Sequence, residues 1–376
     1  MAESDFSQID RRHMARALEL AARGLGRVEP NPMVGAVVAR AEEVLAEAWH
    51  ERFGGPHAEA LALQKAGPAA RDATLYVTLE PCCHQGKTPL CTDAVVAAQI
   101  GRVVVAMSDP FPQVAGRGLE RLRQAGLQVA VGLMEAEARR LNAPFIKLHT
   151  VGRPYVIAKW AMTLDGRLAA PSGDARWISS PQSRQWVHTL RSRMDAILIG
   201  AGTALQDDPL LTVRLEAGAT DYGRRPARIV LDDQLQLPLG SQLAATAGQA
   251  PLIVVTRLDA DAARAKELQQ RGAEVLRVAE GHAGLALEPL LEQLARRSMT
   301  NILVEGGRHV LASFFAEHQV DRLAVFIAPK LVGGEPRDAP AGPPGLKLMN
   351  EALPLLRPTV ALIGDDVLIE GVLRDY

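Results

Sequence analysis

The chain is poor in cysteine, nearly neutral and without long apolar runs. It has 3 cysteines among 376 residues, which excludes the disulfide framework of a small secreted protein. Its formal net charge of -1 gives no general attraction to nucleic acid or an anionic membrane, so local cations must hold any anionic ligand. No apolar run is long enough to span a bilayer, and the polar residues 1–5 are unlike a signal peptide. We therefore expect a cytoplasmic protein without a nucleic-acid or membrane partner.

The chain does contain enough apolar sequence for two folded domains. Hydrophobic residues make up 48% and charged residues 23%, which is typical of a soluble globular protein. A length of 376 residues exceeds one ordinary core. Gly152-Arg153-Pro154 is the clearest break, so the sequence predicts domains at residues 1–150 and 151–376.

Hydrophobic periodicity predicts an α/β fold in both halves. In the first half it predicts helices at 9–24, 57–66, 90–99 and 136–149, and strands at 34–38, 44–49, 74–79, 102–107 and 127–131. In the second half it predicts strands at 155–160, 195–199, 228–231, 252–256, 274–278, 301–304 and 322–327. Because helical patterns lie between several of these strands, we expect a largely parallel sheet there.

Two short motifs in the first half combine the residue types of a zinc site. His57-Ala58-Glu59 opens a predicted helix, and Pro81-Cys82 follows the predicted strand at 74–79. Eight residues separate Cys82 from Cys91, which opens another helix whose positive end favours a thiolate. One imidazole and two thiolates fill three positions of tetrahedral zinc and leave the fourth for water. The pattern is typical of zinc-dependent base deaminases, although their two cysteines are usually closer together.

Glu59 is the predicted catalytic residue of this site. It lies in the same helical turn as His57, so it reaches the same cavity. Zinc lowers the pKa of its bound water toward ~7, and Glu59 would carry protons from that water to the ring nitrogen and the departing amine. A structural zinc site is the alternative, but such a site normally has four protein ligands and no fourth is evident. Cys83 is predicted not to be a ligand.

The first half, residues 7–148, resembles the cytidine deaminase superfamily, which implies an α/β/α domain. The segments Cys82–Cys91 and Pro30–Gly35 narrow the resemblance to the bifunctional riboflavin biosynthesis family RibD. This resemblance implies a diaminopyrimidinone substrate that carries a ribosylamino phosphate. The family usually has serine at the position of Cys83 and proline at that of Leu90.

Four polar residues are candidates for binding this substrate. His84 and Lys87 lie between the two zinc cysteines and add donors suited to a phosphate or a ribose. Asn31 lies in a proline-flanked turn and offers a donor and an acceptor to a pyrimidine edge. His50 is a further candidate for the phosphate. The alternatives are solvated surface positions for Lys87 and His50 and a structural turn for Asn31.

A glycine pair after a strand is the clearest feature of the second half. The predicted strand at 301–304 is followed by Glu305-Gly306-Gly307-Arg308 and a helix. Two glycines allow close approach of a ligand to the backbone, and a helix start favours phosphate. A tight packing turn is the alternative. Since no Gly-x-Gly-x-x-Gly follows the first strand of this half, an ordinary Rossmann fold is not indicated.

Residues 154–373 resemble the dihydrofolate-reductase-like α/β reductase domain of the same family, on the segments Lys159–Gly166, Trp177–Ser179 and Asp207–Arg214. The resemblance implies NADPH-dependent reduction of the ribosyl group to a ribityl chain, and a homodimer. Motif by motif, it implies that the cofactor is bound by Ala161, Trp177, Thr203, Asp207, Gly306, Gly307, Arg308 and His309. It implies that the substrate is bound by Arg191, Leu211, Arg214 and Glu305, with the arginines on its phosphate.

Three alternatives to a bifunctional enzyme stay open. A nucleic-acid base deaminase would have a basic surface and a short Cys-x-x-Cys spacing, and this chain has neither. A zinc-binding scaffold without activity would give Glu59 no reason to lie beside the triad. A second half that only binds a nucleotide is favoured by Ala175, where the family often has serine. For the hydride step no general acid stands out, and Asp207 is the candidate.

Overall fold

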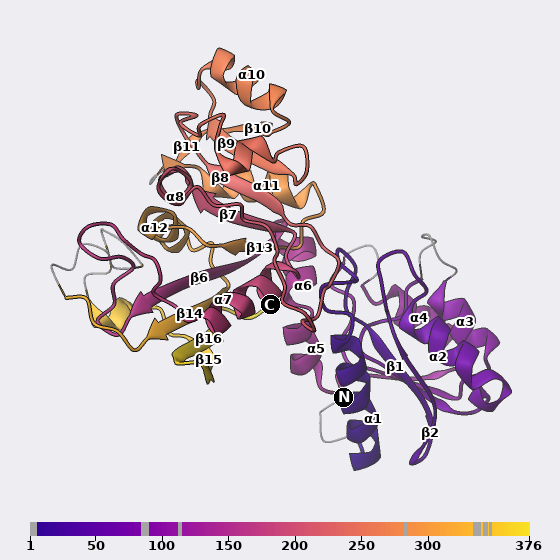
Figure 1. Cartoon of the computed structure of the whole chain (residues 1–376). Coiled ribbons are helices and arrows are strands. Elements are labelled where there is room, and N and C mark those ends of the chain that lie inside the picture. The colour runs from indigo at the N-terminus through magenta and orange to yellow at the C-terminus, as the bar shows by residue number, and fades with distance from the viewer. Residues whose placement is uncertain are drawn as a thin grey trace. The chain divides into compact units, whose positions relative to one another are not determined.

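The chain folds into two compact units in the computed structural model shown in Figure 1. The structure describes residues 6–83, 90–111, 115–281, 284–333, 340, 345 and 348–376. The first unit comprises Met1–Gly152 with Tyr376, and the second comprises Arg153–Asp375. In the part of the chain that is described, no helix is both long and apolar enough to cross a bilayer.

The first unit is built on a five-stranded sheet with the order β2-β1-β3-β4-β5. Its strands are β1 (Gly35–Arg40), β2 (Glu43–Trp49), β3 (Thr74–Val77), β4 (Arg102–Val105) and β5 (Gln128–Val131). Strand β1 is antiparallel to both β2 and β3, whereas β3, β4 and β5 are parallel. The carboxyl ends of the parallel strands therefore meet at one edge, where Cys82 follows β3.

Helices cover both faces of this sheet, with α1 and α5 on one face and α2, α3 and α4 on the other (Figure 1). The helices are α1 (Gln8–Ala22), α2 (Ala58–Ala66), α3 (Cys91–Ala97), α4 (Arg117–Gln124), α5 (Glu135–Leu141) and α6 (Ala143–Val151), with a 3₁₀ turn at Gly67–Ala70. Gly35 allows α1 to lie directly on β1, because a Cβ atom there would be 2.0 Å from the Ala17 carbonyl oxygen.

The second unit is built on a nine-stranded sheet with the order β10-β9-β8-β7-β13-β6-β14-β16-β15. The seven strands from β10 to β14 in this order are parallel, and β16 and β15 add an antiparallel edge. The strands are β6 (Tyr155–Thr163), β7 (Ala196–Gly200), β8 (Ala227–Leu231), β9 (Leu252–Arg257), β10 (Glu274–Val278), β13 (Asn301–Val304), β14 (Arg322–Ala328), β15 (Leu356–Ile363) and β16 (Asp366–Val372).

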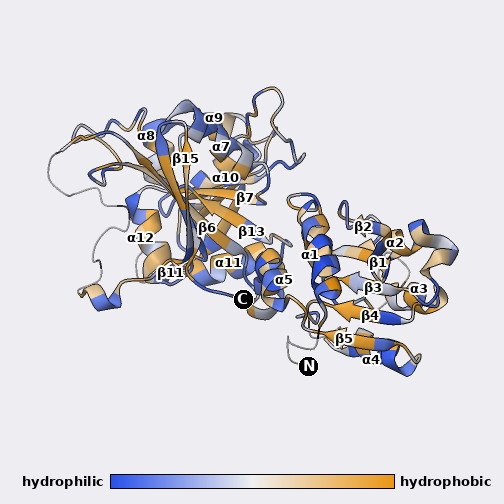
Figure 2. Ribbon diagram, turned by 90° about the horizontal axis from the view of Figure 1, so that it is seen from below, coloured by the Kyte–Doolittle hydropathy of each residue, from blue (hydrophilic) through white to orange (hydrophobic). Residues whose placement is uncertain are grey.

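Both faces of the large sheet are buried near its centre. In β7, Ala196 and Leu198 belong to one apolar cluster, whereas Ile197 and Ile199 belong to another. Alternate side chains of a strand point to opposite faces, so the two clusters are two cores on either side of the sheet. Figure 2 shows β6, β7 and β13 as hydrophobic ribbons.

The remaining elements of this unit are helices and a short hairpin. The helices are α7 (Pro181–Arg191), α8 (Ala201–Asp207), α9 (Gln242–Ala245), α10 (Ala262–Gln270), α11 (Leu287–Ala295) and α12 (Arg308–Ala316), with a 3₁₀ turn at Met349–Glu351. The hairpin pairs β11 (Glu280–Gly281) with β12 (Gly284–Leu285).

The sequence predicted the α/β class and most of these elements, with three errors. The helix expected at 136–149 is two helices, because Asn142 leaves the helical path and bonds with the backbone of Met33. Helix α4 was missed because its sequence RGLERLRQ is mostly polar. Strands β15 and β16 were also missed, since every residue of β15 from Leu356 to Leu362 is exposed and gives no alternating pattern.

A buried carboxylate joins α1 to β3 and β4. Asp10 accepts hydrogen bonds from the Tyr76 hydroxyl at 2.8 Å and the Arg102 guanidinium at 2.7 Å, and it closes a capping box with Ser7. Burial alone would raise the pKa of Asp10, but these hydrogen bonds lower it to about 2. A depressed carboxyl pKa stabilises the fold above the unfolded pKa of ~3.9, and this contribution is lost as the pH falls toward 2.

Asp10→Asn should therefore destabilise the first unit by about 2 kcal/mol at pH 7. The reason is that the hydrogen bonds that lower the pKa of Asp10 to about 2 stabilise its carboxylate in the folded state, and the variant has no carboxylate there. The difference from the wild type should fall to about half at pH 3. Hydrogen exchange of β3 and β4 amides in the full chain measures it. Glu42→Gln is the control, because its ion pair with Arg12 is exposed and should contribute less than about 1 kcal/mol. An equal difference at pH 7 and pH 3 would contradict this account.

Candidate active sites

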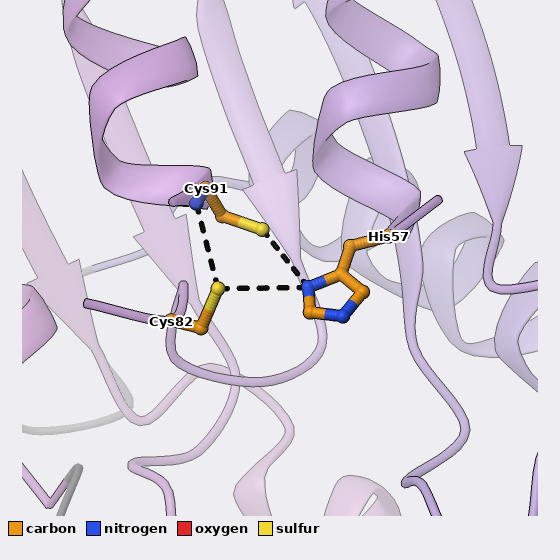
Figure 3. Close-up of side chains that lie close together, drawn as sticks. All are labelled: His57, Cys82 and Cys91. Atoms are coloured by element: carbon orange, nitrogen blue, oxygen red, sulfur yellow. Dashed lines mark hydrogen bonds between the residues drawn. The ribbon is translucent and has the colours of Figure 1, made fainter. Parts of the chain in front are cut away.

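His57, Cys82 and Cys91 meet at one point of the first unit, as Figure 3 shows. His57 is the N-cap of α2, Cys82 follows β3 and Cys91 is the first residue of α3. The His57 Nδ1 atom is 3.1 Å from Cys91 Sγ and 3.6 Å from Cys82 Sγ. Two ligands at ~2.0 and ~2.3 Å from a tetrahedral zinc ion would lie about 3.5 Å apart. The donor set and its spacing therefore fit zinc.

The two thiols of this triad differ in their protonation. Hydrogen bonds from Cys91 lower the pKa of Cys82 to about 4, whereas the nearby Cys82 sulfur and burial raise the pKa of Cys91. The Cys91 backbone N–H also lies 3.4 Å from Cys82 Sγ. A thiolate beside a thiol and an imidazole is a preformed site for a soft divalent cation, since thiolates are the metal-binding form of cysteine.

Glu59 lines the cavity beside the triad. The cavity has a volume of about 360 Å³, and its lining includes His57, Glu59 and Cys82. Glu59 is buried in the first turn of α2, and burial raises the pKa of its carboxyl group. A buried carboxyl group with a raised pKa exchanges protons more readily near neutral pH than an exposed one.

Asn31 and His50 also line this cavity and are hydrogen-bonded to each other. His50 is buried, its Nδ1 lies 3.0 Å from the Pro56 carbonyl oxygen, and its Nε2 lies 3.1 Å from Asn31 Nδ2. Nδ1 must donate to the carbonyl, so Nε2 accepts from the Asn31 amide. Burial lowers the pKa of His50, which keeps the ring neutral. Because both ring nitrogens are occupied, this arrangement favours orientation of Asn31 over binding of a phosphate by His50.

Asn142 holds the turn that carries Asn31. Its side-chain oxygen accepts from the Met33 N–H at 2.8 Å, and its amide donates to the Met33 carbonyl at 2.9 Å. Both hydrogen bonds are buried. The junction of α5 and α6 therefore fixes the backbone two residues from Asn31. Sequence reasoning missed this residue because its partner is 109 positions away.

Glu80 fixes a second wall of the cavity. Its carboxylate is buried and accepts four backbone N–H groups, those of Asp109, Gly116, Gly118 and Leu119, at 2.9 to 3.3 Å. Glu80 itself precedes Pro81-Cys82 directly. Residues of the segment that leads from β4 to α4 are thereby tied to the segment after β3 that carries Cys82.

Four aromatic residues that sequence reasoning did not predict line this cavity, Phe53 and a group of three. Phe111, Phe145 and His149 all line it, and the His149 ring lies 4.9 Å from the Phe111 ring and 4.5 Å from the Phe145 ring. Such tilted ring contacts stabilise a fixed arrangement. The predicted substrate residues His84 and Lys87 lie outside the described residues.

In the second unit, a cavity of about 840 Å³ brings the four predicted substrate residues together. Arg191, at the end of α7, forms a bidentate ion pair with Glu305 at 2.6 and 2.8 Å. Leu211 and Arg214 come from the segment after α8, and Leu211 has a φ of 51°, which is uncommon for a leucine. Burial would raise the pKa of Glu305, but Arg191 holds it below its usual range.

Lys159 and His188 also line this cavity, and sequence reasoning assigned no role to either. Burial lowers the pKa of Lys159 and lowers that of His188 to about 4. The lining contains five cationic side chains, those of Lys159, Arg176, Arg184, Arg191 and Arg214, and four carboxylates, those of Asp207, Asp208, Glu216 and Glu305. Around His188 the cations are Lys159, Arg191 and Arg214 and the carboxylate is Glu305, so this part of the cavity suits a phosphorylated ligand.

The predicted cofactor residues line two cavities that share five residues. The second cavity has a volume of about 630 Å³. The residues common to both are Leu168, Ala175, Thr203, Asp207 and Gly307. Ala161, Trp177 and Gly306 line only the larger cavity, whereas Arg308 and His309 line only the smaller one. The shared lining gives room for an extended ligand such as a dinucleotide.

Two glycines in the lining of these cavities, Gly306 and Gly200, lie close against Val310. A Cβ atom on Gly306 would lie 2.5 Å from Val310 Cβ, and one on Gly200 would lie 2.7 Å from Val310 Cγ2. Glycine at both positions lets the start of α12 lie against β7, and the first backbone N–H groups of a helix have no partner within the helix. Those groups and the helix dipole favour a phosphate, so the residues present fit a pyridine dinucleotide.

Both halves of the chain match known sequence families. Residues 7–107 match the cytidine and deoxycytidylate deaminase zinc-binding region. Residues 154–357 match the RibD C-terminal domain. The predicted arrangement of a deaminase-like half followed by a reductase half is therefore confirmed.

Three relatives are similar to the chain over nearly its whole length. Riboflavin biosynthesis protein RibD of Aquifex aeolicus is 42% identical over 96% of this chain and 98% of the relative. The solved structure of Acinetobacter baumannii RibD, form 1, has a TM-score of 0.85 at 34% identity, and the match covers 97% of this chain and 99% of that structure's chain. A diaminohydroxyphosphoribosylaminopyrimidine deaminase/5-amino-6-(5-phosphoribosylamino)uracil reductase from Thermotoga maritima has a TM-score of 0.80 at 36% identity. That match covers 96% of this chain and 98% of the other. The chain belongs to the RibD family.

Proposed function

We propose that residues 1–150 form a pyrimidine deaminase and residues 151–376 a reductase that acts on its product. The substrate is 2,5-diamino-6-ribosylamino-4(3H)-pyrimidinone 5′-phosphate, and the final product is 5-amino-6-ribitylaminouracil 5′-phosphate. Both activities are in the printed name of the Thermotoga maritima relative. The observation that carries the proposal is the cluster of His57, Cys82 and Cys91, two of whose members, His57 and Cys82, line the same cavity as the buried Glu59.

In the deaminase, the triad holds zinc and Glu59 carries the protons. Zinc, when bound, activates a water molecule for attack on the amine-bearing ring carbon. Glu59 takes one proton from that water and passes it to the ring nitrogen, and it then takes the second proton of the attacking oxygen and passes it to the amine, which departs as ammonia. Asn31, oriented by His50 and Asn142, offers a donor or an acceptor to the pyrimidine edge. The predicted roles of His84 and Lys87 on the ribose phosphate complete the site.

In the reductase, the chain orients the sugar phosphate against the nicotinamide. NADPH, when bound, supplies the hydride. The cofactor lies along Ala161, Trp177, Thr203, Asp207 and the start of α12, and Arg214 and Lys159 attract the phosphorylated substrate. Arg191 holds Glu305 in place by its bidentate ion pair.

Glu305 and Lys159 are better placed than Asp207 to handle the proton of the reduction. The Asp207 side chain is 40% exposed and forms an ion pair with Arg176 at 3.8 Å. Glu305 and Lys159 are partly buried residues of the cavity lining, and the charge of each affects the pKa of the other. We therefore assign the proton step to this pair and a cofactor-binding role to Asp207.

A homodimer through β15 and a cytoplasmic location complete the proposal. Strand β15 is an edge of the large sheet and pairs only with β16 among the described strands. Val360 and Leu362, which share one face of β15, are 69% and 74% exposed. An apolar edge strand is a ready surface for a second copy of the sheet.

Glu59→Gln should abolish ammonia release, with a loss of at least about 10³-fold in kcat, because the amide cannot accept the water proton. Zinc content should stay unchanged, since Glu59 is not a ligand. Ammonia release from the aminopyrimidine phosphate measures the loss. Reduction of chemically supplied 5-amino-6-(5-phosphoribosylamino)uracil by the same variant is the control for folding. Retained deamination would show that the proton carrier is another group.

Gly306→Ala should weaken NADPH binding about tenfold or more, because the added methyl group meets Val310 at 2.5 Å and must displace the start of α12. Titration of NADPH fluorescence measures the dissociation constant. Gly240→Ala is the matched control, since a Cβ atom there has no neighbour within 4 Å. An unchanged dissociation constant in G306A would remove this turn from the cofactor site. A wild type that binds NADPH but never oxidises it would favour the regulatory role that Ala175 suggests.

The double variant Val360→Lys, Leu362→Lys should be monomeric, because two ammonium groups on each β15 would repel across the interface. Size-exclusion chromatography with light scattering gives the mass. Val44→Lys is the control, since Val44 is an exposed residue on β2, the edge strand of the other sheet. Dimers of unchanged stability in the double variant would place the interface elsewhere.

A further inference from the structure

His188 lies among the ionised groups of the reductase cavity. It is in α7, three residues before Arg191, and it lines the cavity together with Arg214 and Glu305. His188 is neither one of the predicted substrate residues nor one of the predicted cofactor residues. Its ring has one hydrogen bond among the described residues, and that bond is to backbone.

The partner of His188 determines its tautomer. The backbone N–H of Arg214 lies 3.2 Å from His188 Nδ1. A backbone N–H group only donates, so Nδ1 must accept, and the neutral ring carries its proton on Nε2. An imidazolium would place two N–H groups against each other. The hydrogen bond therefore requires a neutral His188.

The charges around the ring maintain this neutral state. Lys159 from β6, Arg191 from α7 and Arg214 from the segment after α8 face it, against the single carboxylate of Glu305. Burial and the two arginines lower the pKa of His188 to about 4. The ring thus remains an acceptor for Arg214 throughout the range in which the enzyme is assayed.

Arg214 needs such an anchor because its side chain has no ion pair in the described part of the chain. Its residue is exposed, and the surrounding residues 208–216 form no helix or strand. The bond to His188 joins this segment to α7, the helix that also ends in Arg191. Together with the hydrogen bond that Arg191 Nη1 donates to the Thr212 carbonyl at 3.5 Å, it sets the distance between the two arginines that flank the substrate.

We propose that His188 is a positioning residue of the reductase, which fixes the backbone of Arg214 through Nδ1 and so aims its guanidinium at the substrate phosphate. This proposal rests on the reductase function proposed above. His188 acts here as a neutral hydrogen-bond acceptor and makes no charge contact with the phosphate.

Three substitutions separate the two ring nitrogens. His188→Asn places an oxygen near the position of Nδ1 and should stay within about threefold of the wild type. His188→Gln places its amide nearer to Nε2, and it should raise the KM for 5-amino-6-(5-phosphoribosylamino)uracil about tenfold, as should His188→Ala. The kcat and the NADPH dissociation constant should change less than threefold in all three. Thr189→Ala is the control, because its hydroxyl bonds only within α7.

Two further measurements decide the outcome. The ratio of KM between H188N and the wild type should be constant from pH 6 to pH 8; a ratio that grows as the pH falls would show that His188 binds phosphate as a cation and would overturn the proposal. Equal effects of H188N and H188A would do the same. Hydrogen exchange of residues 208–216 should be faster in H188A and H188Q but not in H188N. This readout needs no turnover, so it tests the anchor even if the wild type does not oxidise NADPH, a result that would refute the proposed reductase instead.

Deamination by the same variants monitors the fold of the full chain. It should be unchanged in all of them, because His188 is in the second unit.

Discussion

The first unit depends on the need of one imidazole and two sulfur atoms for a shared cation. Their ligand atoms all lie within 4.8 Å of one another, and they come from two helix starts and one strand end. Without a metal ion, the contacts within this group are hydrogen bonds to sulfur, which are weak. With zinc, three separate elements become covalently linked through one atom, and metal binding contributes to folding as well as to catalysis.

Around this centre, buried polar side chains fix the backbone of the loops that line the cavity. Glu80 uses one carboxylate to fix four backbone N–H groups, and Asn142 uses one amide to fix both polar groups of Met33. Each would be costly to bury alone, so each is stable only in this one arrangement. In the second unit, Arg191 and Glu305 are likewise stable in their mostly buried positions because each charge is paired with the other.

The sequence predicts those features that arise from neighbouring residues. Parallel strands such as β7 are continuous apolar runs, and His57, Glu59 and Cys82 lie in short motifs whose residue types state their chemistry. Features that depend on distant partners were not predicted. The break at Asn142 interrupts a pattern that is periodic through it, and the hydrogen bond between His188 and Arg214 joins residues 26 positions apart. The exposed β15 carries no alternation, because neither of its faces is buried within one chain.

The break between α5 and α6 changes where the deaminase ends. The zinc-binding family match stops at residue 107, yet Asn142, Phe145 and His149 support or line the cavity. A gene fragment cut at the boundary of the family would encode every zinc ligand and still lack the residues that hold the substrate turn. The segment that matches the zinc-binding family model is therefore shorter than the segment that builds the deaminase cavity. A separation of the two activities into independent proteins has to keep the longer segment.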